Sequence, residues 1–143
     1  MPYKFLEDVA IADVAFEAWG DTVEEMFTAA AEATMNVMVA DLDAIEPRVA
    51  RKVELESETL EMLLFSLLQE LIFYKDAEML LLRVEDVAIE HRDNLYSMKA
   101  NAYGEDIDPG KHDLIVDVKA VTLHKFRVEQ TDRGWETFVI LDI

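Results

Sequence analysis

The chain has 143 residues, 52% hydrophobic and 31% charged, which is the size of one domain with enough apolar material for a buried core. It carries 13 basic and 31 acidic side chains, a formal net charge of -18. A surface of that charge repels phosphate groups, which argues against direct binding of nucleic acid or of anionic membranes. The lack of cysteine excludes disulfides, zinc–thiolate sites and thiol nucleophiles.

The cellular compartment follows from the same features. Residues 1–13 contain no basic start followed by an apolar core, which is the pattern of a secretory signal. The most apolar run, residues 60–73, is interrupted by polar side chains and is too short to cross a bilayer. We therefore expect a cytoplasmic, soluble protein that has no membrane partner.

The first part of the chain predicts two strands followed by a helix. Alternating side chains over residues 3–19 indicate the strands, and Gly20 ends that pattern. Asp21 and Glu24 have the spacing of a capping box, in which a carboxylate accepts a hydrogen bond from the first helical turn. Apolar residues then recur every three or four positions, which predicts a helix from Thr22 to about residue 40.

The remainder predicts one more strand, the core helix and a series of strands. Residues 48–56 return to alternation, and Ser57 is expected to cap a strongly hydrophobic helix over residues 58–76. Four strand-like segments follow, near residues 79–90, 94–104, 116–130 and 135–142. This order predicts an α+β fold, with a single domain over residues 1–143 in which two helices pack on a largely antiparallel β-sheet.

Several common sites are not indicated. The three histidines, His91, His112 and His124, form no pair at the spacing of a helical metal site. The four glycines form no phosphate-binding series. The acidic loop at residues 105–113 fails the register of an EF-hand calcium loop, so we interpret it as a surface turn.

Carboxylates at the end of the chain suggest a cation site. Residues 135–143 form a hydrophobic strand in which Asp142 shares a face with Phe138 and Ile140, next to the Ile143 carboxylate. Two adjacent anionic groups repel each other unless a cation joins them, and such hard oxygen donors favour calcium or magnesium. Asp13 begins a strand, and it would converge with Asp142 and Ile143 if the two strands are neighbours. The alternative is that Asp13 is an ordinary turn residue.

Taken together, several stretches carry a family resemblance: residues 12–16, 19–27, 63–65, 70–72, 119–124 and 139–143. In order and spacing they resemble archease, the small protein that assists the tRNA-splicing RNA ligase of the RtcB class. The Lys-Ala-Val-Thr-x-His segment at 119–124 and the Asp-Ile ending are the most specific parts. The resemblance implies a non-enzymatic activator that helps the ligase become guanylylated and turn over, and that broadens the nucleotides the ligase uses.

The resemblance also implies particular site residues. It places a divalent-metal site, usually assigned to calcium, at Asp13, Asp142 and the Ile143 carboxylate, and it makes Lys119 and His124 functional positions. In an unbroken strand Lys119 and His124, five residues apart, face opposite sides, so only a bulge lets both reach one partner.

The chain departs from the family at one place. Ala10 and Ile11 stand where the family has histidine and threonine before the aspartate, so any role of those two side chains is in doubt here. The metal assignment uses Asp13 and is unaffected.

Two other hypotheses stay open. The first is an acidic chaperone-like protein without a dedicated ligase partner, for which the negative surface and the apolar helix would suffice. The second is a metal-dependent hydrolase that uses His112, His124 and nearby acids as ligands or base.

Overall fold

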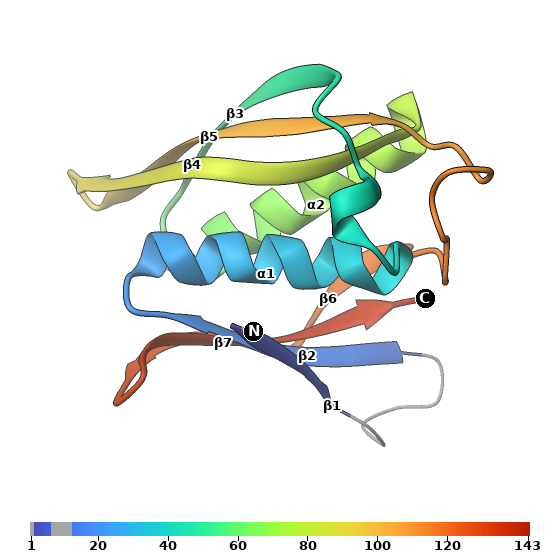
Figure 1. Ribbon diagram of the computed structural model, residues 1–143. Coiled ribbons are helices and arrows are strands. Elements are labelled where there is room, and N and C mark those ends of the chain that lie inside the picture. The colour runs from blue at the N-terminus through green and yellow to red at the C-terminus, as the bar shows by residue number, and fades with distance from the viewer. Residues whose placement is uncertain (1, 7–12) are drawn as a thin grey trace.

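The computed structural model describes residues 2–6 and 13–143, in which two helices lie between two antiparallel sheets (Figure 1). Its helices are α1 (Val23–Met38), α2 (Leu60–Glu78) and a short 3-10 helix (Leu42–Ala44). Its strands are β1 (Tyr3–Leu6), β2 (Asp13–Gly20), β3 (Val49–Ser57), β4 (Leu80–Arg92), β5 (Leu95–Asp106), β6 (Ala120–Thr131) and β7 (Gly134–Asp142). The α+β class is confirmed.

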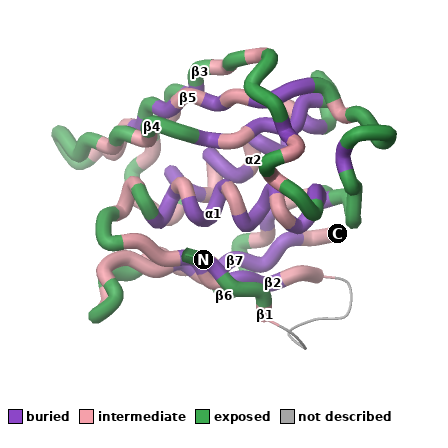
Figure 2. Tube along the Cα trace, viewed as in Figure 1, coloured by how far each residue is buried: buried purple, intermediate pink, exposed green. Residues whose placement is uncertain are grey.

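The strands divide into a four-stranded sheet, in the order β1-β2-β7-β6, and a three-stranded sheet, β3-β5-β4. The sequence had predicted one sheet. The physical reason for two is that each helix packs against strands of both sheets, and α1 is buried even through the consecutive residues Ala29, Ala30 and Ala31. A helix that is apolar nearly all round needs a layer on each side. Figure 2 shows this burial concentrated in the middle layer.

Both helices begin one or two residues later than the sequence predicted. The cap of α1 is Thr22, whose hydroxyl accepts a hydrogen bond from the Glu25 backbone at 3.1 Å, while the Glu25 carboxylate accepts from the Asp21 backbone. The cap of α2 is Thr59, because Ser57 is still the last residue of β3. A polar side chain caps each helix as predicted, but the capping residue lies one position later than predicted at α1 and two positions later at α2.

The sixth strand is shorter than predicted. Residues 116–119 are extended but lie outside the sheet, and β6 begins at Ala120. Its pairing with β7 is then interrupted between Thr122 and Arg127, where Lys125 has a φ of 58°. Apolar alternation reports only that a segment is extended, not whether a neighbouring strand is available, so the sequence could not locate the start of pairing.

The turn after β5 is built around a buried ion cluster. The Glu105 carboxylate, 8% exposed, accepts hydrogen bonds from the Glu46 backbone at 2.8 Å and from Lys111. Those two bonds, the first above all, lower the pKa of Glu105 to about 2. His112 Nδ1 accepts from the Asp108 backbone, so its Nε2–H is the group that donates to Glu105 at 3.0 Å. The acidic loop is therefore held in place by hydrogen bonds from its own Lys111 and His112 to Glu105.

Among the residues the structure describes, no helix is both long enough and apolar enough to cross a membrane.

Candidate functional site

The candidate site lies where β2, β7 and β6 meet at one end of the four-stranded sheet. Strands β2 and β7 are antiparallel neighbours, with Asp13 directly opposite Asp142. Ala120, the first residue of β6, is opposite Asp142 on the other side. The structure thus brings together carboxylates that lie 129 positions apart in the sequence.

The two aspartates share the outer face of the sheet. Phe16 and Ala18 of β2 point toward the helices and are fully buried, so Asp13, three positions before Phe16, points the other way. Directly opposed residues have Cβ atoms about 5 Å apart, and like charges there destabilise the pair. Asp13 and Asp142 are both half-buried, which weakens the screening of this repulsion by water.

The donor chemistry of this site fits a hard divalent cation. No ion pair within the described residues involves Asp13 or Asp142. No group of three or more His, Cys, Asp or Glu side chains that would hold a metal occurs in the described part of the chain. The predicted ligand set is Asp13, Asp142 and the carboxylate of Ile143, and of these the structure places Asp13 and Asp142 opposite each other. Calcium accepts such oxygen-only sites and completes its shell with water or partner oxygens.

Cations gather at the other end of the same face. Glu17 of β2 lies 3.6 Å from Lys4 and 3.8 Å from Arg127. Arg133, in the β6–β7 turn, pairs with Glu136 and stacks over the Trp19 ring, 4.6 Å from its centroid. Sequence analysis missed this cluster, although alternation in β2 already put Glu17 and Trp19 on the face of Asp13.

Lys119 is tied to the site through its backbone. It immediately precedes β6, and its N–H donates to the Asp142 carbonyl at 2.8 Å. Its side chain is exposed. Lys119 therefore stands beside the aspartate pair as β6 enters the sheet.

His124 lies in the interrupted part of β6 and is exposed. The condition under which Lys119 and His124 would face opposite sides, an unbroken strand, is therefore not met. The Thr122 hydroxyl, within the same motif, is buried and has no hydrogen-bond partner among the described residues. Thr122 is opposite Ile140 and so shares the outer face with Asp142. Sequence analysis did not single it out.

The histidines of the hydrolase hypothesis lie in different parts of the fold. His112 follows β5 of the three-stranded sheet, whereas His124 is in β6 of the four-stranded sheet. Both ring nitrogens of His112 are occupied, by Glu105 and by the Asp108 backbone, so neither is available to a metal. The positions at which the chain departs from the family, Ala10 and Ile11, lie outside the described residues.

Comparison with known proteins gives one consistent family. Residues 3–143 match the model of the Archease protein family (MTH1598/TM1083). A protein archease of Pyrococcus abyssi is 40% identical over 133 residues, which cover 92% of this chain and 93% of that protein. A protein archease of Methanopyrus kandleri is 33% identical over the full length of both.

Solved structures agree with the sequence matches. The solution structure of protein 1598 from Methanobacterium thermoautotrophicum is 34% identical, has a TM-score of 0.85 and covers 99% of both chains. The crystal structure of an archease from Thermotoga maritima, described as a possible chaperone, has a TM-score of 0.58 at 17% identity. That second structure covers 94% of this chain and 93% of its own, and its similarity concerns the fold alone.

Proposed function

Because the chain belongs to the archease family, we propose that it is a non-enzymatic, cytoplasmic activator of an RtcB-class tRNA-splicing RNA ligase. It promotes guanylylation and multiple turnover of the ligase and broadens the nucleotides that the ligase accepts. The chemistry belongs to the partner, and this chain supplies a binding surface and a cation site.

One observation supports this proposal most strongly. Three of the six segments that carry the family resemblance, those that contain Asp13, Lys119 and Asp142, meet at one end of a single sheet. Asp13 is opposite Asp142, and Lys119 donates a backbone hydrogen bond to Asp142. Residues that only support a fold would be spread through the core, whereas Asp13 and Asp142 are half-buried on the outer face of the sheet and Lys119 is exposed.

A divalent cation, calcium in the first place, would be held by Asp13, Asp142 and the Ile143 carboxylate. When bound, it would cancel the repulsion between the opposed carboxylates and hold the ends of β2 and β7 in one geometry. Lys119 and His124 would then present exposed polar groups to the ligase from the start of β6. These residues orient the contact and perform no bond-making step.

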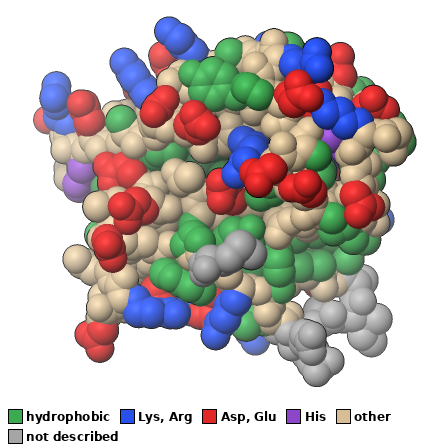
Figure 3. Space-filling model, viewed as in Figure 1, with side chains coloured by type: hydrophobic (Ala, Val, Ile, Leu, Met, Phe, Trp, Pro, Cys, Tyr) green, Lys and Arg blue, Asp and Glu red, His purple; other side chains and the backbone are tan. Residues whose placement is uncertain are grey.

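Long-range charge would assist the encounter. The chain carries -18, and acidic side chains are spread over the face seen in Figure 3. A ligase that binds RNA has a basic surface, so attraction would speed association and favour a competent ligase conformation. Stimulation should accordingly weaken as ionic strength rises.

The test is multiple-turnover RNA ligation with guanylylated ligase quantified in parallel. The ligase is measured alone, with this protein, with Asp13→Ala and with a control, Glu129→Gln, which removes a charge from an exposed position of the same sheet. We expect stimulation by the natural chain and by Glu129→Gln but not by Asp13→Ala. No stimulation of a ligase known to be active would overturn the proposal.

A second candidate function is a general chaperone, which the description of the Thermotoga maritima structure favours. A general chaperone would suppress aggregation of unrelated unfolded proteins and would not depend on Asp13. Suppression of citrate synthase aggregation by both the natural chain and Asp13→Ala, without ligase stimulation, would favour this candidate.

A further inference from the structure

An extended segment, residues 113–118, connects the two sheets across the end of the helical layer, and we call it the strap. It runs from the turn after β5 to the start of β6. Over residues 113–116, Asp113 and Ile115 provide the backbone hydrogen bonds to the rest of the described fold. The Ile115 N–H donates to the Met38 carbonyl at 2.8 Å, and the Asp113 carbonyl accepts from the Ala40 N–H at 2.9 Å.

The other side of the strap is an unused strand edge. In an extended chain the N–H and C=O groups of alternate residues point to the same side. The N–H and C=O groups of Leu114 therefore point away from Met38 and Ala40. Neither these groups nor those of Val116 have a backbone partner within residues 2–6 and 13–143. An open edge of this kind is a template for a further strand.

The strap also exposes apolar side chains. Leu114, Ile115 and Val116 are 43%, 55% and 38% exposed. Folded domains rarely leave three consecutive large apolar residues in water without an interaction that covers them.

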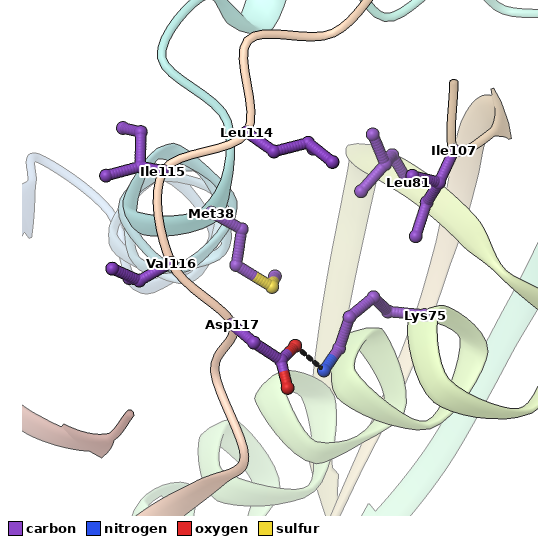
Figure 4. Close-up of a pocket in the computed structure, with 8 residues that line it drawn as sticks. All are labelled: Met38, Lys75, Leu81, Ile107, Leu114, Ile115, Val116 and Asp117. Carbon is purple, nitrogen blue, oxygen red and sulfur yellow. Dashed lines mark hydrogen bonds and ion pairs between the residues drawn. The ribbon is translucent and has the colours of Figure 1, made fainter. Parts of the chain in front are cut away.

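A hollow of about 230 Å³ opens beside the strap. Figure 4 shows Leu114 and Met38 pointing into it, Leu81 and Ile107 facing them, and Ile115 and Val116 on the far side of the strap. The volume is sufficient for one aliphatic side chain.

The strap itself carries two carboxylates, Asp113 and Asp117, and no basic side chain. Lys75 is buried, and its ammonium is bound by Asp117 at 2.5 Å, by Asp76 at 2.6 Å and by the Val118 carbonyl at 2.7 Å. Two carboxylates thus share one cation, and Asp113 at the other end of the strap is exposed. A segment docked here would meet carboxylates at both ends.

We propose that the strap docks an extended segment of a partner protein in which apolar and basic side chains alternate. The segment adds as a strand along Leu114–Val116, inserts one aliphatic side chain into the hollow and directs lysine or arginine toward Asp113 and Asp117. A second copy of this chain fits poorly, because antiparallel pairing of two straps centred on Ile115 places Asp113 opposite Asp117. The carboxylates likewise disfavour nucleic acid.

The probe is a fluorescein-labelled peptide, Lys-Ile-Lys-Val-Lys-Ile-Lys, with blocked ends. A peptide of the same composition in the block order Lys-Lys-Lys-Lys-Ile-Val-Ile controls for charge alone. Near physiological salt we expect the alternating peptide to bind about tenfold more tightly by fluorescence anisotropy. Amide exchange at Leu114 and Val116 should slow by about tenfold in its presence.

Two variants test the edge. Val116→Pro removes the unused N–H donor, and Val116→Lys places a cation on the strap; either should weaken binding by about tenfold. Met62→Lys is the matched control, because Met62 is 39% exposed in α2, and it should bind normally. Each variant is first shown to unfold at the same urea concentration as the natural chain. If Val116→Pro fails that check, Val116→Lys decides.

Three results would overturn the proposal. They are equal binding of the two peptides, protection of amides other than Leu114 and Val116, and protection that grows with protein concentration alone, which would identify a second copy as the occupant. The peptide assay contains no ligase, and Asp142→Asn should retain peptide binding. A failure of the docking proposal is therefore distinguishable from a failure of the proposed function.

Discussion

Strand β7 has a carboxylate near each of its two ends, and each faces a carboxylate of a neighbouring strand. Glu136 faces Glu129 of β6, and Asp142 faces Asp13 of β2. The two pairs differ in whether basic side chains of the protein neutralise them. Near the hairpin, Arg127 lies 2.5 Å from Glu129, and Arg133 pairs with Glu136. At the other end, the described residues provide no basic partner for Asp13 or Asp142.

The difference separates a structural carboxylate pair from one available to a ligand. The glutamates are neutralised by their own chain, so an added cation would have little to gain there. The aspartates keep the repulsion of like charges opposed across a ladder, and an external cation relieves it. The Asp13–Asp142 end of β7 is therefore the end at which we propose that a cation binds.

The largest expected difference between the two ends is the response to calcium. At about a hundred times its dissociation constant, calcium should raise the free energy of unfolding by about 2.7 kcal/mol. Asp142→Asn should abolish most of that gain, and Glu129→Gln should keep it, in urea unfolding with calcium or after its removal by EDTA. An equal gain in Asp142→Asn would contradict a calcium site at the Asp13–Asp142 pair.

Removing an arginine at the hairpin should leave the Glu129–Glu136 pair less neutralised, as the Asp13–Asp142 pair already is. Arg133→Ala loses the pairing with Glu136 and the contact with the Trp19 ring, and should lower the free energy of unfolding by about 1 kcal/mol. Arg92→Ala is the control, because Arg92 is 81% exposed and lies 3.9 Å from Glu90. A loss no larger in Arg133→Ala than in Arg92→Ala would contradict the role given to Arg133.

Removing a carboxylate should have opposite signs at the two ends when no cation is present. Asp142→Asn relieves repulsion and should raise the free energy of unfolding by about 0.5 kcal/mol, whereas Glu136→Gln breaks a compensated pair and should lower it by about 0.5 kcal/mol. Chemical denaturation in EDTA measures both. Changes of the same sign would show that charge balance does not distinguish the pairs.

The smallest expected effect is on the pH dependence of the stability, because Glu136 is one of 31 acidic residues. A hydrogen bond with the Thr131 side chain, and then Arg133, lower the pKa of Glu136 below its usual 4.5. A lowered folded-state pKa gives stability that is complete above 4.5 and is lost as the pH falls through the lowered value. Thermal unfolding of Glu136→Gln should therefore decline less steeply between about pH 5 and 3. Identical profiles would mean that Glu136 gains nothing from its partners.

Local patterns in the sequence predict most of the helices and strands, but they do not predict how these assemble into sheets. Periodicity located both helices and most strands, since burial of one face imposes a repeat along the chain. It could not show that the strands form two sheets, nor that residues 116–118 have no strand partner among the described residues, because pairing joins residues distant in sequence. The caps were misplaced because neighbouring Asp, Thr and Ser residues are chemically equivalent as caps until the backbone chooses one.

The sequence by itself determined the fold class, the family and the kind of donor at the proposed site, because these follow from residue types and short spacings. Only the tertiary structure decided that Asp13 is opposite Asp142 with no basic side chain of the described residues paired to either, while Glu129 and Glu136 are opposite each other and each pairs with an arginine. The reason is that strand register is set by long-range pairing, and a shift of one residue would move each carboxylate to the other face of the sheet.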